Sequence, residues 1–107
     1  MANSFKNAKA DLTTTNATTL YTVPSATTTI IKSILVSEDS GNADTITVTL
    51  TNASSAVFSL FKVKAVGANT TVELLTAPLV VTESEIIKVT AATANRLHVV
   101  ASLLEVS

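Results

Sequence analysis

Cysteine is absent from this 107-residue sequence, and aromatic residues and charge are both scarce. Without cysteine, the chain can form neither a disulfide framework nor a thiolate metal site. Aromatic residues make up 4% of the chain and tryptophan is missing, which counts against a carbohydrate site built on aromatic faces. Charged residues make up 14%, with a formal net charge of -1. This balance excludes a general electrostatic affinity for nucleic acid or for an anionic membrane.

Long hydrophobic runs are missing as well. No run approaches the roughly 18 residues that would span a bilayer, and residues 1–6 lack the apolar core of a secretory signal. We therefore expect a protein that is made and folds in the cytoplasm and has no membrane partner. Such a protein can still leave a cell inside a released particle, because that route needs no signal.

The chain is instead rich in β-branched residues, with 19 Thr, 13 Val and 6 Ile. These side chains lose freedom in helices and pack well on pleated sheets. In residues 45–51, three aliphatic residues alternate strictly with four threonines, which is typical of a half-buried strand. A turn-rich segment, 38–44, separates this strand from an apolar one at 28–37. The pattern predicts that the two strands form a β-hairpin with a longer loop.

Further strands are predicted at similar spacing, over residues 9–14, 18–23, 56–66, 70–75, 79–81, 85–91 and 96–106. Helices compete at two places: residues 82–85 match a capping box, and the segment from 97 has apolar residues at helical spacing. Alternation favours strands at both places. We predict an all-β, antiparallel, jelly-roll-like sandwich of about seven or eight strands.

The predicted domain organisation is one sandwich over residues 9–107, preceded by an N-terminal arm at 1–8. The arm is polar, lacks periodicity and carries Phe5 as its one anchor. We expect it to be disordered when free and ordered when docked on a neighbour.

Few side chains are candidates for chemistry. His98 is the only histidine, and a metal site or catalytic triad would need partners that spacing alone does not supply. Glu83 and Glu85 resemble paired carboxylates, but glycoside hydrolysis needs a cleft between two such groups. We interpret His98 as a strand residue and predict no enzymatic activity, no cofactor and no metal.

An acidic cluster surrounds Gly41 in the turn-rich segment. It consists of Glu38, Asp39 and Asp44. The cluster lacks the spacing and the closing glutamate of a calcium-binding loop. We interpret it as a solvated hairpin tip.

Several predicted strands are apolar on both faces. By parity, Ile30, Ile34 and Val36 lie opposite Ile31 and Leu35. The strand at 56–66 and the last strand also carry apolar residues on both faces. In the last strand, Leu97, Val99, Ala101 and Leu103 lie opposite Val100, Leu104 and Val106. A small sandwich has one core, so its outer faces should be polar. The surplus indicates cover by another copy of the chain or by a larger scaffold. We expect a homo-oligomer, most simply a trimer.

The candidate interface residues follow from this surplus and from the anchor of the arm. They are Phe5, Ile30, Ile34, Phe58, Leu60 and Lys62. Lys62 shares its strand with Phe58 and Leu60, and no stacking aromatic residue accompanies it as a nucleic-acid site would require. We therefore predict a protein interface and no nucleic-acid partner.

At Leu20-Tyr21-Thr22-Val23-Pro24 the chain resembles small virion structural proteins of tailed bacteriophages, which often carry this Tyr-Thr-Val-Pro element early. The similarity continues through a long strand at 29–36, a Thr/Val strand at 45–50 and the segment from Pro78 to Asn95, and covers roughly residues 18–106. The family usually has Ala-Gly after the proline, where Ser25 and Ala26 stand here. This departure weakens the expectation of a tight turn.

The resemblance implies a β-sandwich that acts by binding and not by catalysis. Its first implication is a capsid decoration or cement protein that oligomerises and clamps neighbouring subunits of the major capsid protein, within the virion. A neck or tail accessory protein is the second. Two other classes stay open: a host-surface or glycan-binding adhesin module, and a small enzyme, which would need a cleft that joins His98 to a carboxylate.

Overall fold

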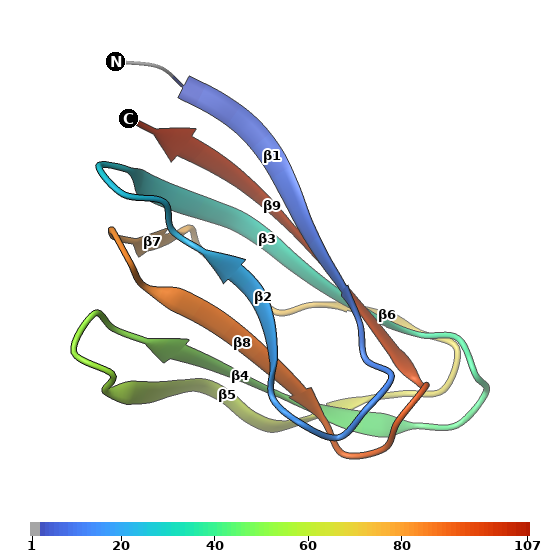
Figure 1. Cartoon of the computed structure of the whole chain (residues 1–107). Helices are drawn as coiled ribbons and strands as arrows, with labels where there is room; N and C mark the ends of the chain where they lie inside the picture. Colours follow the sequence, from blue (N-terminus) through green and yellow to red (C-terminus); the bar gives the residue numbers. More distant parts are fainter. Residues whose placement is uncertain (1–2) are drawn as a thin grey trace.

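Two layers of antiparallel strands form the protein (Figure 1), and the computed structural model describes residues 3–107. The strands are β1 (Asn3–Asp11), β2 (Thr18–Thr22), β3 (Thr28–Glu38), β4 (Asp44–Thr51), β5 (Val57–Val66), β6 (Thr71–Glu73), β7 (Leu79–Val81), β8 (Ile86–Ala91) and β9 (Leu97–Val106). Sheet A has the order β1-β9-β3-β6, with β7 also paired to β3; sheet B has the order β2-β8-β4-β5. With β7 set aside, this is the strand order of a jelly roll. The predicted all-β sandwich is confirmed.

The predicted hairpin between β3 and β4 is wrong. β3 pairs with β9, β6 and β7 in sheet A, whereas β4 pairs with β5 and β8 in sheet B. The turn-rich segment therefore crosses from one sheet to the other. A hairpin and such a crossing have the same sequence pattern, two alternating strands around a polar loop, so the pattern does not distinguish them.

The first described residues form a strand and not a separate arm. β1 pairs with β9 from Asn3 opposite Val106 to Asp11 opposite His98, and Ala8 and Ala10 pack against the core. The arm expected at residues 1–8 is thus the first part of β1, apart from residues 1–2, which lie outside the described residues. Small alternating alanines gave the strand a weak sequence signal, and pairing with β9 determines its structure.

A shift in register on β3 determines which of its residues reach the core. The β3–β9 pairing shifts between Ile31 and Ser33, and such an irregularity reverses the side-chain parity beyond it. Ile31, Ile34 and Val36 are consequently all fully buried. The parity of the sequence placed Ile34 opposite Ile31, so the prediction that Ile34 lies on an outer face is wrong. Its exposed fraction is 0%, which removes it from the candidate interface.

Two turns contain no glycine and are closed by hydrogen bonds to glutamate side chains. Thr82 N–H donates a hydrogen bond of 2.7 Å to the Glu85 carboxylate, so the capping-box residues close a turn between β7 and β8 and do not start a helix. Ala26 has a φ of 54°, and its N–H donates to the Glu83 carboxylate. The turn after Pro24 is therefore present, with alanine in the left-handed conformation that glycine favours. Among residues 3–107, no helix is long and apolar enough to cross a membrane.

Candidate contact surface

Rows of residues paired across strands cross the outer face of sheet A, which points away from the core. One row is entirely apolar, because Phe5 pairs with Leu104, Leu104 with Ile30, and Ile30 with Val80. We call these four residues the apolar row: Phe5, Leu104, Ile30 and Val80. Phe5 and Val80 at its ends are 77% and 56% exposed, and the two central residues are half-buried. The row spans β1, β9, β3 and β7 (Figure 1).

A second row lies further along the same strands. Its members are paired in the order Lys9, Val100, Leu35 and Glu73, and we call them the mixed row. Val100 and Leu35 at its centre are 38% and 39% exposed. The row thus has an apolar centre, with the positive charge of Lys9 at one end and the negative charge of Glu73 at the other.

Glu73 is held in place at the edge of sheet A. Its carboxylate accepts hydrogen bonds from the N–H groups of Ile34 at 2.8 Å and Leu75 at 3.1 Å, and from the Ser33 hydroxyl. Burial alone would raise the pKa of this carboxyl, but the hydrogen bonds outweigh burial and lower the pKa. Glu73 is therefore an anion at neutral pH with a fixed position.

A cation lies over the ring of Phe5. Lys32 Nζ lies 5.9 Å from the centroid of the Phe5 ring, which is within the range of a cation–π interaction. Together with Asn7 and Ser102, these residues border an open depression of about 330 Å³. The surface between the two rows is therefore hollowed.

The outer face of sheet B has a different character. β4 directs its threonines outward, opposite the buried Ile46 and Val48, and β8 places the half-buried Lys88 and Thr90 beside Thr49 and Thr47. Hydroxyl groups of this kind can face water. The apolar surplus predicted from sequence is therefore concentrated on sheet A and on the edge strand β5.

A polar network lies beneath the apolar row. The Tyr21 hydroxyl donates to the Glu105 carboxylate at 2.5 Å and lies 2.8 Å from the Thr29 hydroxyl, and Lys6 Nζ lies 2.9 Å from Glu105. Lys6 and Glu105 directly adjoin Phe5 and Leu104 in their strands, so the network anchors two strands of the row.

The network shifts the acidity of its members. Burial and, second to it, the hydrogen bond to Glu105 together raise the pKa of Tyr21 to about 12. Hydrogen bonds from Lys6 and Tyr21 lower the pKa of Glu105. Sequence reasoning singled out Tyr21 only as part of the Tyr-Thr-Val-Pro element, because partners 84 residues apart in the chain leave no local signal.

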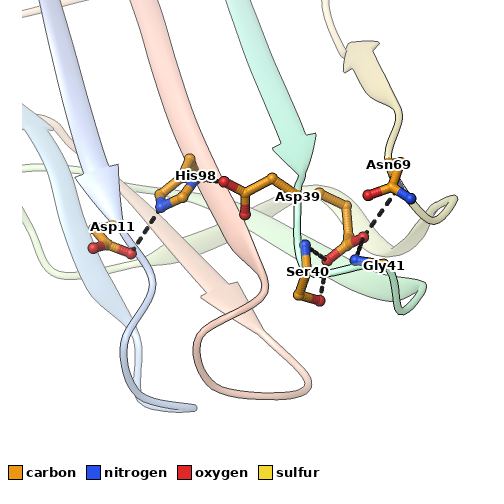
Figure 2. A network of polar contacts seen from close by, with 7 residues as sticks. Asp11, Asp39, Ser40, Gly41, Asn69 and His98 are labelled. Atoms are coloured by element: carbon orange, nitrogen blue, oxygen red, sulfur yellow. Dashed lines mark hydrogen bonds and ion pairs between the residues drawn. The ribbon is translucent and has the colours of Figure 1, made fainter.

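His98 lies between two aspartates at the far end of sheet A (Figure 2). Its Nε2 is 3.2 Å from Asp11 Oδ1, and its Nδ1 is 3.5 Å from Asp39 Oδ2. The structure thus joins His98 to carboxylates, as the enzyme hypothesis required. However, the second ring nitrogen faces Asp39, where a catalytic triad would have a serine.

The acidic cluster is not a solvated hairpin tip. Glu38 and Asp44 are only 2% and 7% exposed, although Asp39 is exposed as expected. The Glu38 carboxylate accepts hydrogen bonds from the N–H groups of Ser40 at 2.8 Å and of Gly41 and Asn69 at 3.0 Å (Figure 2). It thereby ties the crossing between the sheets to the loop before β6.

These contacts also change the acidity of Glu38. Burial alone would raise its pKa, but the hydrogen bonds from Ser40, Asn69 and Gly41 outweigh burial and lower the pKa to about 2. No cluster of three or more His, Cys, Asp or Glu side chains suited to a metal ion occurs within residues 3–107. Glu83 and Glu85 cap separate backbone groups, at Ala26 and Thr82.

The predicted interface residues fall into three groups. Phe5 and Ile30 lie together in the apolar row, and Ile34 lies in the core. Phe58, Leu60 and Lys62 lie on β5, the edge strand of the other sheet.

The β5 group borders a second apolar feature. Phe58 is 53% exposed, Lys62 is exposed, and the half-buried Leu60 lines an open cleft of about 310 Å³ together with Phe61, Pro78 and Leu79. The structure thus places two apolar surfaces on the molecule, one on the face of sheet A and one along β5.

Sequence reasoning left two members of the apolar row out of the candidate set. Leu104 was assigned to the second apolar face of the last strand, which was a usable signal. Val80 lies in a short strand that is apolar throughout, so alternation does not distinguish its outer residue from its inner ones.

Comparison with known proteins gives little similarity. No family model matches the chain, and no curated protein matches it. Among solved structures, the chain is similar to a chain in the structure of infectious bursal disease virus Gt strain, with a TM-score of 0.42 and 8% identity over 98% of this chain. The match spans 30% of the length of that viral chain.

Proposed function

We propose that this protein is a non-enzymatic structural component of a virus particle, and first of all a decoration or cement protein on the capsid of a tailed bacteriophage. The observation that carries the proposal is the exposed apolar row on the outer face of a small jelly roll. Monomeric soluble proteins rarely expose contiguous apolar patches larger than roughly a few hundred Å², and larger patches mark contact sites.

The fold and the sequence resemblance support the same class. Jelly rolls are used by viral capsid domains and by lectins, and the Tyr-Thr-Val-Pro element resembles that of phage virion proteins. Tyr21 of this element connects sheet B to β9 beneath the apolar row. The resemblance therefore falls on a residue that supports the contact surface.

The proposed mechanism is clamping. Copies associate with one another through one surface, and each copy attaches to the major capsid protein through a second, for which β5 is the candidate. Phe58 and Val57 there are 53% and 62% exposed, next to the apolar cleft. A multivalent oligomer that contacts neighbouring capsid subunits gains avidity over a single copy and resists their separation.

A neck or tail accessory protein would use the same surfaces on a different substructure. Mass spectrometry of purified particles, with heads and tails separated, distinguishes the two. We expect the protein in the head fraction. Its presence in the tail fraction alone would replace decoration by the accessory role, and its absence from particles would refute a virion function.

Attachment can be tested directly by binding the purified protein to particles that lack it. Phe58→Asp should abolish binding, because it places a charge in the proposed capsid contact. Thr49→Asp, on the threonine face of sheet B, is the matched control and should bind as the wild type does. Equal binding by both variants would exclude β5 as the capsid contact.

An adhesin module is the second candidate, because jelly rolls also occur in lectins and sheet B presents a face of hydroxyl groups. Binding to a glycan array, without binding to particles, would favour it.

A further inference from the structure

The outer face of sheet A is complementary to itself. We propose that it is the contact face of a two-fold symmetric dimer, in which a second copy of this chain covers the apolar and mixed rows. This inference deepens the proposed function, since it assigns a surface and a symmetry to the homo-oligomer.

The complementarity follows from the strand order. When two copies meet face to face about a two-fold axis that runs parallel to the strands between β9 and β3, the order of the strands reverses while the rows stay level. β1 of one copy then faces β6 and β7 of the second, and β9 faces β3. Sheets packed in this way lie about 10 Å apart with strands aligned to within about 30°.

This arrangement matches apolar residues with apolar residues. Phe5 meets Val80 of the second copy, and Leu104 meets Ile30 of the second copy, and both contacts occur twice by symmetry. At the centre of the mixed row, Val100 meets Leu35 of the second copy. The four apolar-row residues, two of them strongly exposed in one copy, are then covered on both copies at once.

Charge is matched at the ends of the mixed row, while Lys32 on the same face, over the Phe5 ring, forms no ion pair within the described residues. The same axis brings Lys9 opposite Glu73 of the second copy, at both ends of the mixed row. Within the described residues, ion pairs involve only Lys6 with Glu105, and His98 with Asp11 and Asp39. Lys9 and Glu73 are both exposed, and neither forms an ion pair with another described residue of its own chain. The paired faces supply the missing partner to each.

The area suffices for association. Sheet A has four strands across this face, and β1 is nine residues long, which gives a face of about 19 Å by about 30 Å. A pair buries about 1,100 Å² in total, above the roughly 1,000 Å² that a specific interface should exceed. A trimer, the oligomer expected from sequence, would not place this face against itself, so the geometry points to a pair.

Sedimentation equilibrium of the full chain tests the proposal. We expect the wild type to sediment at twice 11.1 kDa and Leu104→Asp at the monomer mass. Thr47→Asp on the outer face of sheet B is the control and should stay dimeric. A wild-type monomer, a wild-type trimer, or a Leu104→Asp dimer would overturn the proposal.

A milder variant keeps the test valid should Leu104→Asp fail to fold. Lys9→Glu replaces two attractive contacts with repulsive ones and should raise the dimer dissociation constant roughly tenfold, and less at high salt. Lys62→Glu, the same charge change on β5, should leave the constant unchanged. Equal constants for the wild type and Lys9→Glu would contradict the charge pairing. A monomer that is nonetheless found in particles would refute the dimer and leave the proposed function standing.

Discussion

The Tyr21 hydroxyl donates a hydrogen bond of 2.5 Å to the Glu105 carboxylate and so joins β2 of one sheet to β9 of the other. Glu105 follows Leu104 of the apolar row in β9 and pairs with Thr29. The Tyr21 hydroxyl lies 2.8 Å from the hydroxyl of Thr29, which precedes Ile30 of the row. The apolar row is therefore supported on its core side by a polar network as well as by the aliphatic core.

The acidity of Tyr21 reports on this contact. Its pKa is raised to about 12 from 10.0, first by burial and then by Glu105. Because a raised pKa stabilises the fold below the unfolded value, this stability is present below about pH 10 and is lost as the pH rises toward 12. The chain has one Tyr and no Trp, so ultraviolet absorbance follows this one group. We expect tyrosinate near pH 12 in the folded protein and near pH 10 in urea; titration near pH 10 in both would contradict the contact.

Tyr21→Phe should lower the free energy of unfolding by about 1–2 kcal/mol, because a hydrogen bond to a charged acceptor is lost inside the sandwich. Urea denaturation measures the change. Thr22→Val, which alters an exposed hydroxyl in the same strand, is the control and should change stability little. A Tyr21→Phe variant as stable as the wild type would show that the network does not support the sheets.

Glu38 should make the crossing between the sheets sensitive to acid. Its pKa is lowered to about 2 from 4.5 because the hydrogen bonds from Ser40, Asn69 and Gly41 outweigh its burial. A lowered pKa contributes stability above the unfolded value, so this contribution is present above about pH 4.5 and is lost as the pH falls toward 2.

Urea midpoints measured between pH 7 and pH 2 test this dependence. Glu38→Gln should be less stable than the wild type at pH 7, with a difference that shrinks in acid. Asp39→Asn changes an exposed neighbour and is the control. A difference that stays constant over the whole range would contradict the role of the carboxylate.

Ala26→Gly should stabilise the protein by about 0.5–1 kcal/mol. Alanine stands there at a φ of 54°, and relief of this left-handed conformation outweighs the added flexibility of the unfolded chain. Ala65→Gly in β5 should instead destabilise, because an extended residue gains nothing from glycine. Thermal unfolding of the two variants should therefore show shifts of opposite sign; a loss of stability in both would contradict the strained turn.

Ile30 and Ile34 should respond differently to truncation, because the register shift on β3 sends Ile34 into the core. Ile34→Ala should cost about 2–4 kcal/mol and Ile30→Ala less than about 1 kcal/mol of monomer stability. Urea denaturation of dilute samples, in which the protein is monomeric, measures the free energy of unfolding of the monomer alone. Equal costs would mean that the irregularity between Ile31 and Ser33 is absent.

Regular alternation made part of the fold predictable. In β4, Ile46 and Val48 are buried and the intervening threonines are not, as the pattern indicated. In β3, an unpaired position reverses the parity without any compositional mark, so Ile34 was assigned to the wrong face. The sequence likewise did not show that the chain enters sheet B after β3, because the composition of a loop does not indicate which sheet the next strand joins.

The candidate contact surface was predictable only in part, for the same reason. Phe5 and Ile30 were singled out as surplus apolar residues, and the structure places both in one row. Leu104 links them through pairing between segments from opposite ends of the chain. Such long-range register is decided by the packing of the whole sandwich and not by local sequence.

The most direct test of the account is chemical cross-linking of two cysteine variants, which the cysteine-free chain makes unambiguous. Phe5→Cys and Val80→Cys are mixed and treated with a short bis-maleimide. We predict a cross-linked heterodimer in the mixture and almost none in either variant alone, because the proposed axis places the thiol of the first variant beside the thiol of the second and keeps identical positions about 14 Å apart laterally. A mixture that stays monomeric, or variants that cross-link equally well alone, would contradict the claim that the outer face of sheet A is the contact surface.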